Sequence, residues 1–309
     1  ISLYNEDIME LTTYIGEGGV GKCSAFTALV DKLAEKAGQP IQVYTPYIQS
    51  FANNPNVKMA FEQTLPLNDK RIMDSNNIYY SEPYKSNFQF GNQHLIEAYS
   101  KLHDVEFDVT MRPKMFTENL KPAVDDWKRK HKIVGDYILV QFTGGQSGWS
   151  GGAVNTPYNN NNPGRIYPQW LAQTVINTIK QKYPQCTIID CTLPNEPGYA
   201  GTIKCDLHWS GLHELLKDAK TYVAIDSCLQ HFAASIKKRG VVIWGSTKWT
   251  QFGYTHNTNL HYHMGAKWND NKFDANDPRN VMVEPEKVLN CFEALYNNYK
   301  EKEVKCAKE

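Results

Sequence analysis

The chain has 309 residues, 41% of them hydrophobic and 21% charged, and its 33 basic and 33 acidic side chains give a formal net charge of zero. This composition excludes a disordered chain, and the zero net charge excludes an overall field that would draw the protein to nucleic acid or to an anionic membrane. No apolar run reaches the roughly 18 residues that a membrane-spanning helix needs. Residues 1–14 carry acids where a signal peptide would be basic, and the seven cysteines include no C-x-x-C pair, which suits a reducing compartment. We therefore expect a cytoplasmic protein.

The first predicted elements form a strand–helix–strand unit. Residues 10–16, ELTTYIG, have the β-branched and aromatic content of a strand that runs into glycines. Apolar residues then recur at helical spacing over residues 23–37, and a glycine and a proline follow. Residues 41–47, IQVYTPY, indicate the next strand, so we expect a right-handed crossover between parallel strands.

The same order of elements restarts in the second half of the chain. Strands are predicted at 137–145, 186–191, 221–227 and 241–246, with helices at 168–183, 211–219 and 228–240 between them. Alternating apolar strands and helices are typical of a parallel sheet covered on both faces. We expect an α/β protein with two Rossmann-like domains facing across a cleft, at 1–132 and 133–285. A closing helix in 286–309 should cross back to the N-terminal domain.

The loop after the first strand is close to a phosphate-binding motif. Residues 16–23 read G-x-x-x-x-G-K-C, whereas a P-loop ends in Ser or Thr, whose hydroxyl binds magnesium. Cys23 offers a soft thiol there, and Ser24 comes one position late. A P-loop-like NTPase and a plain strand-to-helix turn stay open as alternatives, beside a loop that faces the phosphates of another ligand.

The most specific pattern lies in residues 210–254, where a helix and an apolar strand precede a D-S-C-x-x-H-x-A-A run and a strand that closes on G-S-T. These residues are Asp226, Ser227, Cys228, His231, Ala233, Ala234, Gly245, Ser246 and Thr247. The pattern resembles glycosyltransferase family 9, the ADP-heptose:lipopolysaccharide heptosyltransferase-like family. Stretches 18–29, 53–57, 164–176 and 284–289 are similar to further motifs of that family, in the same order.

The resemblance implies a GT-B fold and an inverting, metal-independent sugar transfer from a nucleotide-diphosphate sugar to a glycan or another hydroxyl-bearing acceptor, with no cofactor. Helix N-termini would hold the diphosphate. The donor-binding residues expected on this basis are Gly18, Gly19, Gly21, Thr143, Gly144, Gly145, Arg165, Glu196, Asp226, Ser227, Cys228 and His231.

Two departures from the family pattern bear on catalysis. The family has an aspartate as general base where this chain has Lys22, and Glu17 is the nearest carboxylate in the loop, so Glu17 and Lys22 are the catalytic candidates. Cys228 replaces a glycine that lets the backbone approach phosphate. A non-catalytic nucleotide-sugar-binding protein therefore stays open. A modified DNA base also stays open as the acceptor, since the Asn-, Lys- and Tyr-rich composition suggests an AT-rich genome.

The stretch 256–265, HNTNLHYHMG, raises the question of a metal site. His261 and His263 would share one face of a strand, but no carboxylate or cysteine follows at ligand spacing. We expect a loop near the cleft and no metal.

Overall fold

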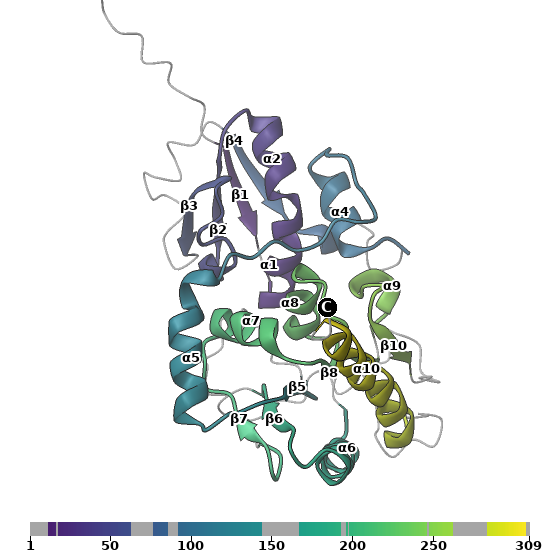
Figure 1. Cartoon of the computed structure of the whole chain (residues 1–309). Helices are drawn as coiled ribbons and strands as arrows, with labels where there is room; N and C mark the ends of the chain where they lie inside the picture. The colour runs from purple at the N-terminus through teal and green to yellow at the C-terminus, as the bar shows by residue number, and fades with distance from the viewer. Residues whose placement is uncertain are drawn as a thin grey trace, which may run out of the picture. The chain divides into compact units, whose positions relative to one another are not determined.

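The computed structural model describes residues 12–16, 18–62, 77–85, 92–143, 167–192, 196, 198–245, 247–261 and 283–306 (Figure 1). The chain forms two compact units, Ile1–Phe116 and Thr117–Glu309. The division falls after Phe116 rather than after residue 132, because helix α5 (Lys121–Lys130) packs against α7 (Trp209–Asp218) of the second unit.

The first unit is built on a four-stranded parallel sheet. Its strands are β1 (Thr12–Gly16), β2 (Ile41–Thr45), β3 (Val57–Glu62) and β4 (Asn77–Ser81), in the order β3-β2-β1-β4. The helices are α1 (Val20–Phe26), α2 (Val30–Ala37) and α4 (Leu95–Leu102), with short 3-10 turns at Thr27–Leu29, Ile48–Ser50 and Pro83–Lys85. The single helix expected over 23–37 is thus two helices joined by a 3-10 turn, and Gly38 ends the second in a left-handed conformation.

Aromatic side chains fill the core of the first unit. Phe26 is fully buried, and its ring centroid lies 5.1 Å from that of Tyr99 and 6.1 Å from that of Phe51. Tyr14 stacks on Tyr79 at 5.3 Å. These contacts fix α1 and the carboxyl end of β1, and therefore the glycine loop between them.

The second unit holds a six-stranded parallel sheet in the order β10-β9-β8-β5-β6-β7. The strands are β5 (Tyr137–Gln141), β6 (Thr187–Asp190), β7 (Ile203–Lys204), β8 (Tyr222–Ile225), β9 (Val241–Trp244) and β10 (Thr258–His261). Its further helices are α6 (Gln169–Lys182), α8 (Cys228–Ser235), α9 (Trp249–Phe252) and α10 (Pro285–Cys306). Two α/β units with parallel sheets confirm the fold class predicted from the sequence.

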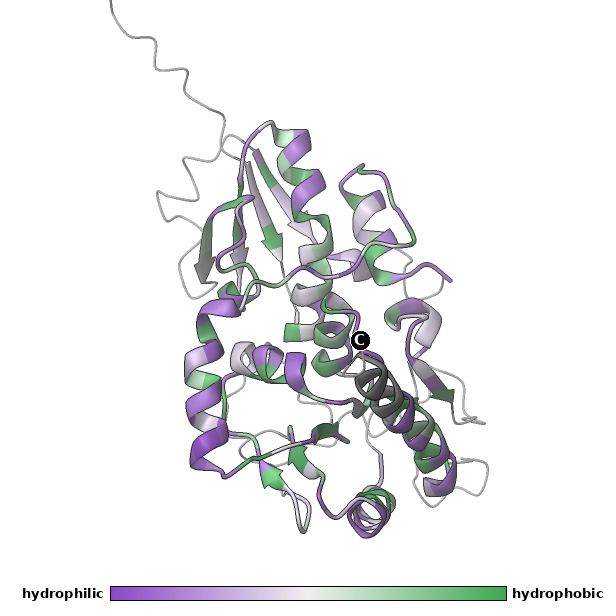
Figure 2. Ribbon diagram, in the orientation of Figure 1, coloured by the Kyte–Doolittle hydropathy of each residue, from purple (hydrophilic) through white to green (hydrophobic). Residues whose placement is uncertain are grey.

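The last helix packs in the second unit, on α6. Figure 2 shows α6 almost end-on, with hydrophobic residues on one side and hydrophilic residues on the other. The buried face of α10 consists of Val288, Leu289, Phe292 and Tyr296. Among the residues that the structure describes, no helix has the length and the apolar character that a membrane crossing needs.

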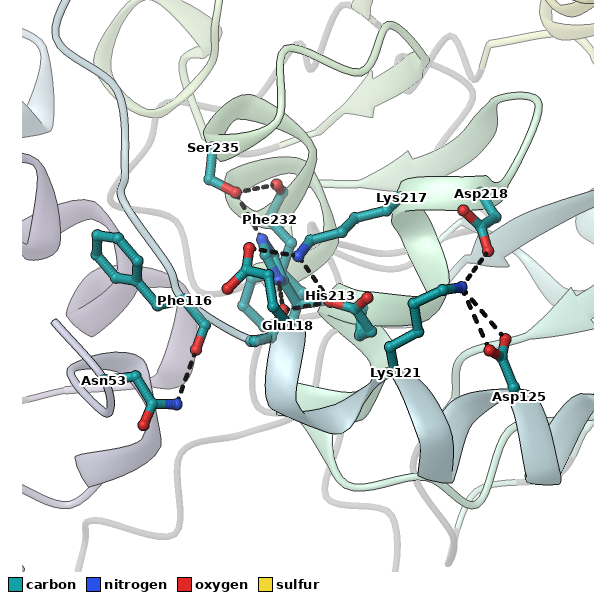
Figure 3. Close-up of polar contacts among 12 residues, drawn as sticks. Asn53, Phe116, Glu118, Lys121, Asp125, His213, Lys217, Asp218, Phe232 and Ser235 are labelled. Atoms are coloured by element: carbon teal, nitrogen blue, oxygen red, sulfur yellow. Dashed lines mark hydrogen bonds and ion pairs between the residues drawn. The ribbon is translucent and has the colours of Figure 1, made fainter.

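The second unit begins with a buried polar cluster between the 3-10 turn Glu118–Leu120 and helix α7 (Figure 3). The Thr117 hydroxyl lies 2.7 Å from His213 Nδ1 and donates to Glu214 Oε2 at 2.8 Å. His213 Nε2 lies 2.7 Å from the hydroxyl of Ser235, the last residue of α8. Thr117 and His213 are 1% and 0% exposed, so these hydrogen bonds hold the first residue of the unit firmly to α7.

Candidate functional site

The predicted donor residues of the second unit that the structure describes lie at or after the carboxyl ends of three neighbouring strands. Strands β8, β5 and β6 lie side by side in the parallel sheet, so the residues that follow them meet at one edge. Thr143 follows β5, Asp226 and Ser227 follow β8, and Glu196 follows β6. Ligands of open α/β sheets bind at this edge.

Helix α8 starts directly at this edge. Ser227 is its N-cap residue, in an extended conformation with φ −150° and ψ 178°, and it makes no side-chain capping bond. Its hydroxyl instead donates to Gln141 Oε1 at 2.7 Å. Cys228 is the first helical residue and is partly exposed. The first turn of α8 therefore lacks the side-chain cap that a serine at this position usually supplies.

His231 lies one turn into α8 and is 4% exposed. Its Nδ1 is 2.9 Å from the hydroxyl of Tyr254, and its Nε2 is 3.1 Å from Gln230 Nε2. Both ring nitrogens thus have protein partners. A hydrogen bond from His231 to a phosphate would require one of these partners to give way.

A second pair links the ends of β5 and β6. The Thr143 hydroxyl donates to Glu196 Oε2, and Lys204 Nζ, from the end of β7, donates to the backbone carbonyl of Glu196. Asp190 supports the turn beneath them by accepting from Thr192 N–H at 3.0 Å and from Tyr199 N–H at 3.3 Å. Burial is the main effect on the Asp190 carboxyl and raises its pKa.

At the end of β9, Gly245 and Thr247 follow the strand. Among the described residues, the buried Thr247 hydroxyl has no hydrogen-bond partner. Thr247 thus adds a buried hydroxyl after β9, which is the neighbour of β8 in the sheet.

The glycine loop of the first unit holds a buried ion pair. Lys22 Nζ lies 2.6 Å from Oε1 and 2.5 Å from Oε2 of Glu82, which follows β4. The side chains are 9% and 11% exposed, and Nζ also lies 4.1 Å from the ring centroid of Tyr84. Gly18 has φ +100°, and a Cβ there would lie 2.6 Å from Lys22 Cδ. The positive φ favours glycine at position 18, and any Cβ there would also displace the Lys22 side chain.

The same loop does not offer a magnesium ligand at the P-loop position. Burial raises the pKa of the Cys23 thiol to about 11, and the thiol packs 3.4 Å from the Thr45 hydroxyl. Ser24 donates its hydroxyl to the Val20 carbonyl of its own helix at 2.8 Å. Because Lys22 is turned to Glu82, the geometry of these three residues does not fit the P-loop alternative.

Several predicted residues lie outside the described part of the chain, namely Glu17, Gly144, Gly145, Arg165, Ser246 and His263. Gly19 is the N-cap of α1 and Gly21 its second residue. Within the described residues, no group of three or more His, Cys, Asp or Glu side chains is arranged to hold a metal ion.

Four residues were not found from the sequence, namely Glu82 at the glycine loop of the first unit and Gln141, Lys204 and Tyr254 at the sheet edge of the second. Gln141 did carry a signal, because it is a polar residue at the carboxyl end of an apolar strand run. Glu82 carried no such signal, because it follows a short strand and its partner Lys22 is sixty positions away in the sequence.

Comparison with known proteins finds one family. Residues 202–282 match the model of glycosyltransferase family 9 (heptosyltransferase). A search of curated proteins finds no match.

Solved structures are similar over nearly the whole chain. A glycosyltransferase family 9 protein from Veillonella parvula superposes with a TM-score of 0.69 at 10% identity, covering 94% of this chain and 98% of the other. ADP-heptose LPS heptosyltransferase II of E. coli gives 0.60 at 12% identity, over 94% and 99%. The E. coli heptosyltransferase WaaC with ADP gives 0.52 at 10% identity, over 81% and 92%. At these identities the likeness shows the fold, which is GT-B-like. Residues 202–282 are thus similar to glycosyltransferase family 9, and the chain has the GT-B-like fold of these neighbours along nearly its whole length.

Proposed function

We propose that the protein transfers a sugar from a nucleotide-diphosphate sugar to an acceptor hydroxyl, with inversion and without a catalytic metal. The observation that carries the proposal is the N-terminus of α8. It lacks a side-chain cap, lies at the carboxyl edge of the six-stranded sheet and belongs to the segment that matches the family model. Backbone N–H groups at such a terminus stabilise the charge that develops on the diphosphate as the sugar leaves. ADP-heptose is the donor to test first, because ADP and heptose appear in the names of the E. coli neighbours.

We assign the donor side to the edge formed by β5, β6 and β8. Asp226 orients the turn before α8, while the α8 terminus faces the diphosphate. Thr143 and Glu196, which are hydrogen-bonded to each other, are suited to the ribose or base, since a carboxylate accepts hydrogen bonds from sugar hydroxyls. Gly144, Gly145 and Arg165 remain proposed donor contacts on the strength of the sequence.

In the reaction, the acceptor oxygen forms a bond to the anomeric carbon as the bond from that carbon to the diphosphate breaks. The electron pair of the broken bond leaves with the diphosphate, and the acceptor proton passes to a base. Lys22 is paired with Glu82, so its ammonium is suited to hold a carboxylate in place rather than to accept a proton. The carboxylate base is therefore Glu82 or Glu17, with Lys22 as its partner.

The acceptor that we propose is a saccharide. A modified DNA base is the second candidate, but the zero formal net charge of the chain gives no general attraction to a polyanion. Because Lys22 stands where the family pattern has an acidic residue, a non-catalytic nucleotide-sugar-binding protein is the third candidate.

A panel of nucleotides and nucleotide sugars in a thermal-shift assay tests the donor. We expect stabilisation by ADP-heptose or another nucleotide-diphosphate sugar, about 2.7 kcal/mol at 100 times the dissociation constant, and no change when EDTA is added. Magnesium-dependent hydrolysis of ATP or GTP that is lost in Lys22→Ala would instead support the P-loop alternative. Binding without transfer to any acceptor would support the non-catalytic one.

Replacing His231 by alanine should weaken donor binding by about 1 to 3 kcal/mol, as for a hydrogen bond to a charged group. Titration calorimetry with ADP measures the effect. Tyr254→Phe is the matched control, because it removes the partner of His231 Nδ1 and leaves the imidazole in place. If His231→Ala binds ADP as tightly as the wild type, the histidine serves only the packing of α8 against Tyr254.

A further inference from the structure

We propose that Gln141 is a positioning residue for the donor site. By accepting the hydroxyl hydrogen of Ser227, Gln141 keeps that serine from capping helix α8 and leaves the first turn of the helix available to the diphosphate. The inference rests on the proposed function and adds a residue to it that lies outside the D-S-C-x-x-H run.

The two side chains are brought together by the register of the sheet. Gln141 is the last residue of β5 and pairs with Ala224 of β8, three positions before Ser227. Gln141 and Ser227 are 5% and 6% exposed, and Ser227 Oγ lies 2.7 Å from Gln141 Oε1. An amide oxygen only accepts hydrogen bonds, so the single hydroxyl hydrogen of Ser227 points toward β5.

Serine is among the best N-cap residues, and it normally accepts a hydrogen bond from the second or third N–H of the helix. In α8 those groups belong to Leu229 and Gln230. Ser227 accepts from neither, although its extended conformation is the one that N-cap residues adopt. The residue type and the backbone therefore favour a cap. A hydroxyl can donate and accept at once, so it is the position of Ser227 Oγ, held 2.7 Å from Gln141 Oε1, that leaves the cap unmade.

Two other helices of this protein show the contrast. His94 caps α4 by accepting from Ile96 N–H at 3.2 Å, and His208 caps α7 by accepting from Ser210 N–H at 3.4 Å. Histidine is a less common cap than serine, yet both histidines make the bond. Ser227 of α8 is a better capping residue and leaves the bond unmade, as Thr117 does at the 3-10 turn Glu118–Leu120.

Capping by Ser227 would compete with the ligand. A serine oxygen that accepts from Leu229 or Gln230 occupies an N–H group that a phosphate oxygen would need, and it partly offsets the positive end of the helix dipole. Because Gln141 holds the Ser227 hydroxyl beside β5, the serine does not compete with the donor for these N–H groups.

The proposal is tested with Gln141→Leu, which removes the acceptor and keeps an apolar side chain of similar length. Freed from Gln141, Ser227 should cap α8, and ADP should bind roughly 5- to 10-fold more weakly in titration calorimetry. Adding Ser227→Ala removes the competing cap, so the double variant should recover most of the lost affinity. Gln173→Leu on α6 is the control, since Gln173 makes exposed hydrogen bonds to Ala200 and should leave ADP affinity unchanged.

Amide hydrogen exchange of Leu229 and Gln230 gives a second measurement that needs no ligand. Both amides should exchange more slowly in Gln141→Leu than in the wild type, and Ser227→Ala should reverse this. Gln141→Met serves if the leucine variant is misfolded. Wild-type affinity in Gln141→Leu, or a double variant weaker than the single one, overturns the proposal. If wild-type protein binds no nucleotide, the donor assignment fails, while unchanged amide exchange would separately refute the role of Gln141.

Discussion

Replacing Glu82 by leucine is expected to lower the free energy of unfolding by about 3 to 5 kcal/mol, because it leaves the Lys22 ammonium buried without its counter-charge. The lysine has few alternatives in the described structure. Its side chain is 9% exposed, and its other contact is the face of the Tyr84 ring, 4.1 Å from Nζ. A cation–π contact recovers only part of the lost interaction. Urea unfolding followed by circular dichroism measures the change.

The double variant Lys22→Met/Glu82→Leu should be more stable than Glu82→Leu, since an apolar pair of similar volume removes the uncompensated charge. The more accessible pair Glu97 and Lys101 on α4 is the control, and its disruption should change stability by less than about 0.5 kcal/mol. If Glu82→Leu unfolds at the wild-type urea concentration, the Lys22–Glu82 pair is solvated in solution. The role of Lys22 as partner of the proposed base would then lose its structural basis.

The parallel sheet of the second unit was predictable from the sequence because its strands are short apolar runs between amphipathic helices. The predicted strands at 137–145 and 221–227 contain β5 and β8, and the helix predicted at 168–183 contains α6. The Asp-Ser turn before α8 could be placed as well, since a strand ending in polar residues before a helix marks the carboxyl edge of a sheet.

The pairings at the site were not predictable from the sequence. Gln141 and Ser227 are 86 positions apart, and Lys22 and Glu82 are 60 apart. Such pairs depend on which strands are neighbours, and the order β8-β5-β6 does not follow the chain. Strand β4 was also missed, because its exposed Ile78, Tyr79 and Tyr80 show no alternation between apolar and polar residues.

The structure changes how two predicted residues would act. Ser227 was expected among the donor-binding residues, and its hydroxyl hydrogen is directed to Gln141. His231 was expected among them too, and it is buried against Tyr254 and Gln230. In both cases the side chain of a motif residue is hydrogen-bonded to a residue outside its own helix. The backbone N–H groups of α8 are thus the more direct candidates for the phosphate contact.

Acidification should destabilise the second unit through His213. Burial, with a smaller contribution from Lys217, lowers the pKa of its imidazole from 6.5 to about 4. The neutral ring is therefore favoured in the folded protein, while the unfolded chain takes up a proton below pH 6.5. The stabilisation is complete above pH 6.5 and is lost as the pH falls from 6.5 to 4, by about 2 kcal/mol at pH 5 and about 3 kcal/mol at pH 4. Burial likewise lowers the pKa of His103 in the first unit to about 4.

Urea unfolding of His213→Phe and His213→Gln between pH 7 and pH 4.5 measures this dependence. In both variants the free energy of unfolding should lose the part of its pH dependence that comes from His213, because neither phenylalanine nor glutamine titrates. The two variants differ in packing at pH 7, but this difference does not depend on pH. Their partners stay satisfied: a neutral ring accepts from one of the two hydroxyls in the wild type, and in the variants Thr117 can donate to Glu214 and Ser235 to the Phe232 carbonyl. His103→Phe is the control in the first unit. It should reduce the pH dependence of the free energy of unfolding of that unit alone. A wild-type slope in both His213 variants would mean that the ring is charged in the folded protein. It would then donate from both nitrogens to Thr117 and Ser235, and the cluster at the start of the second unit would carry a buried imidazolium.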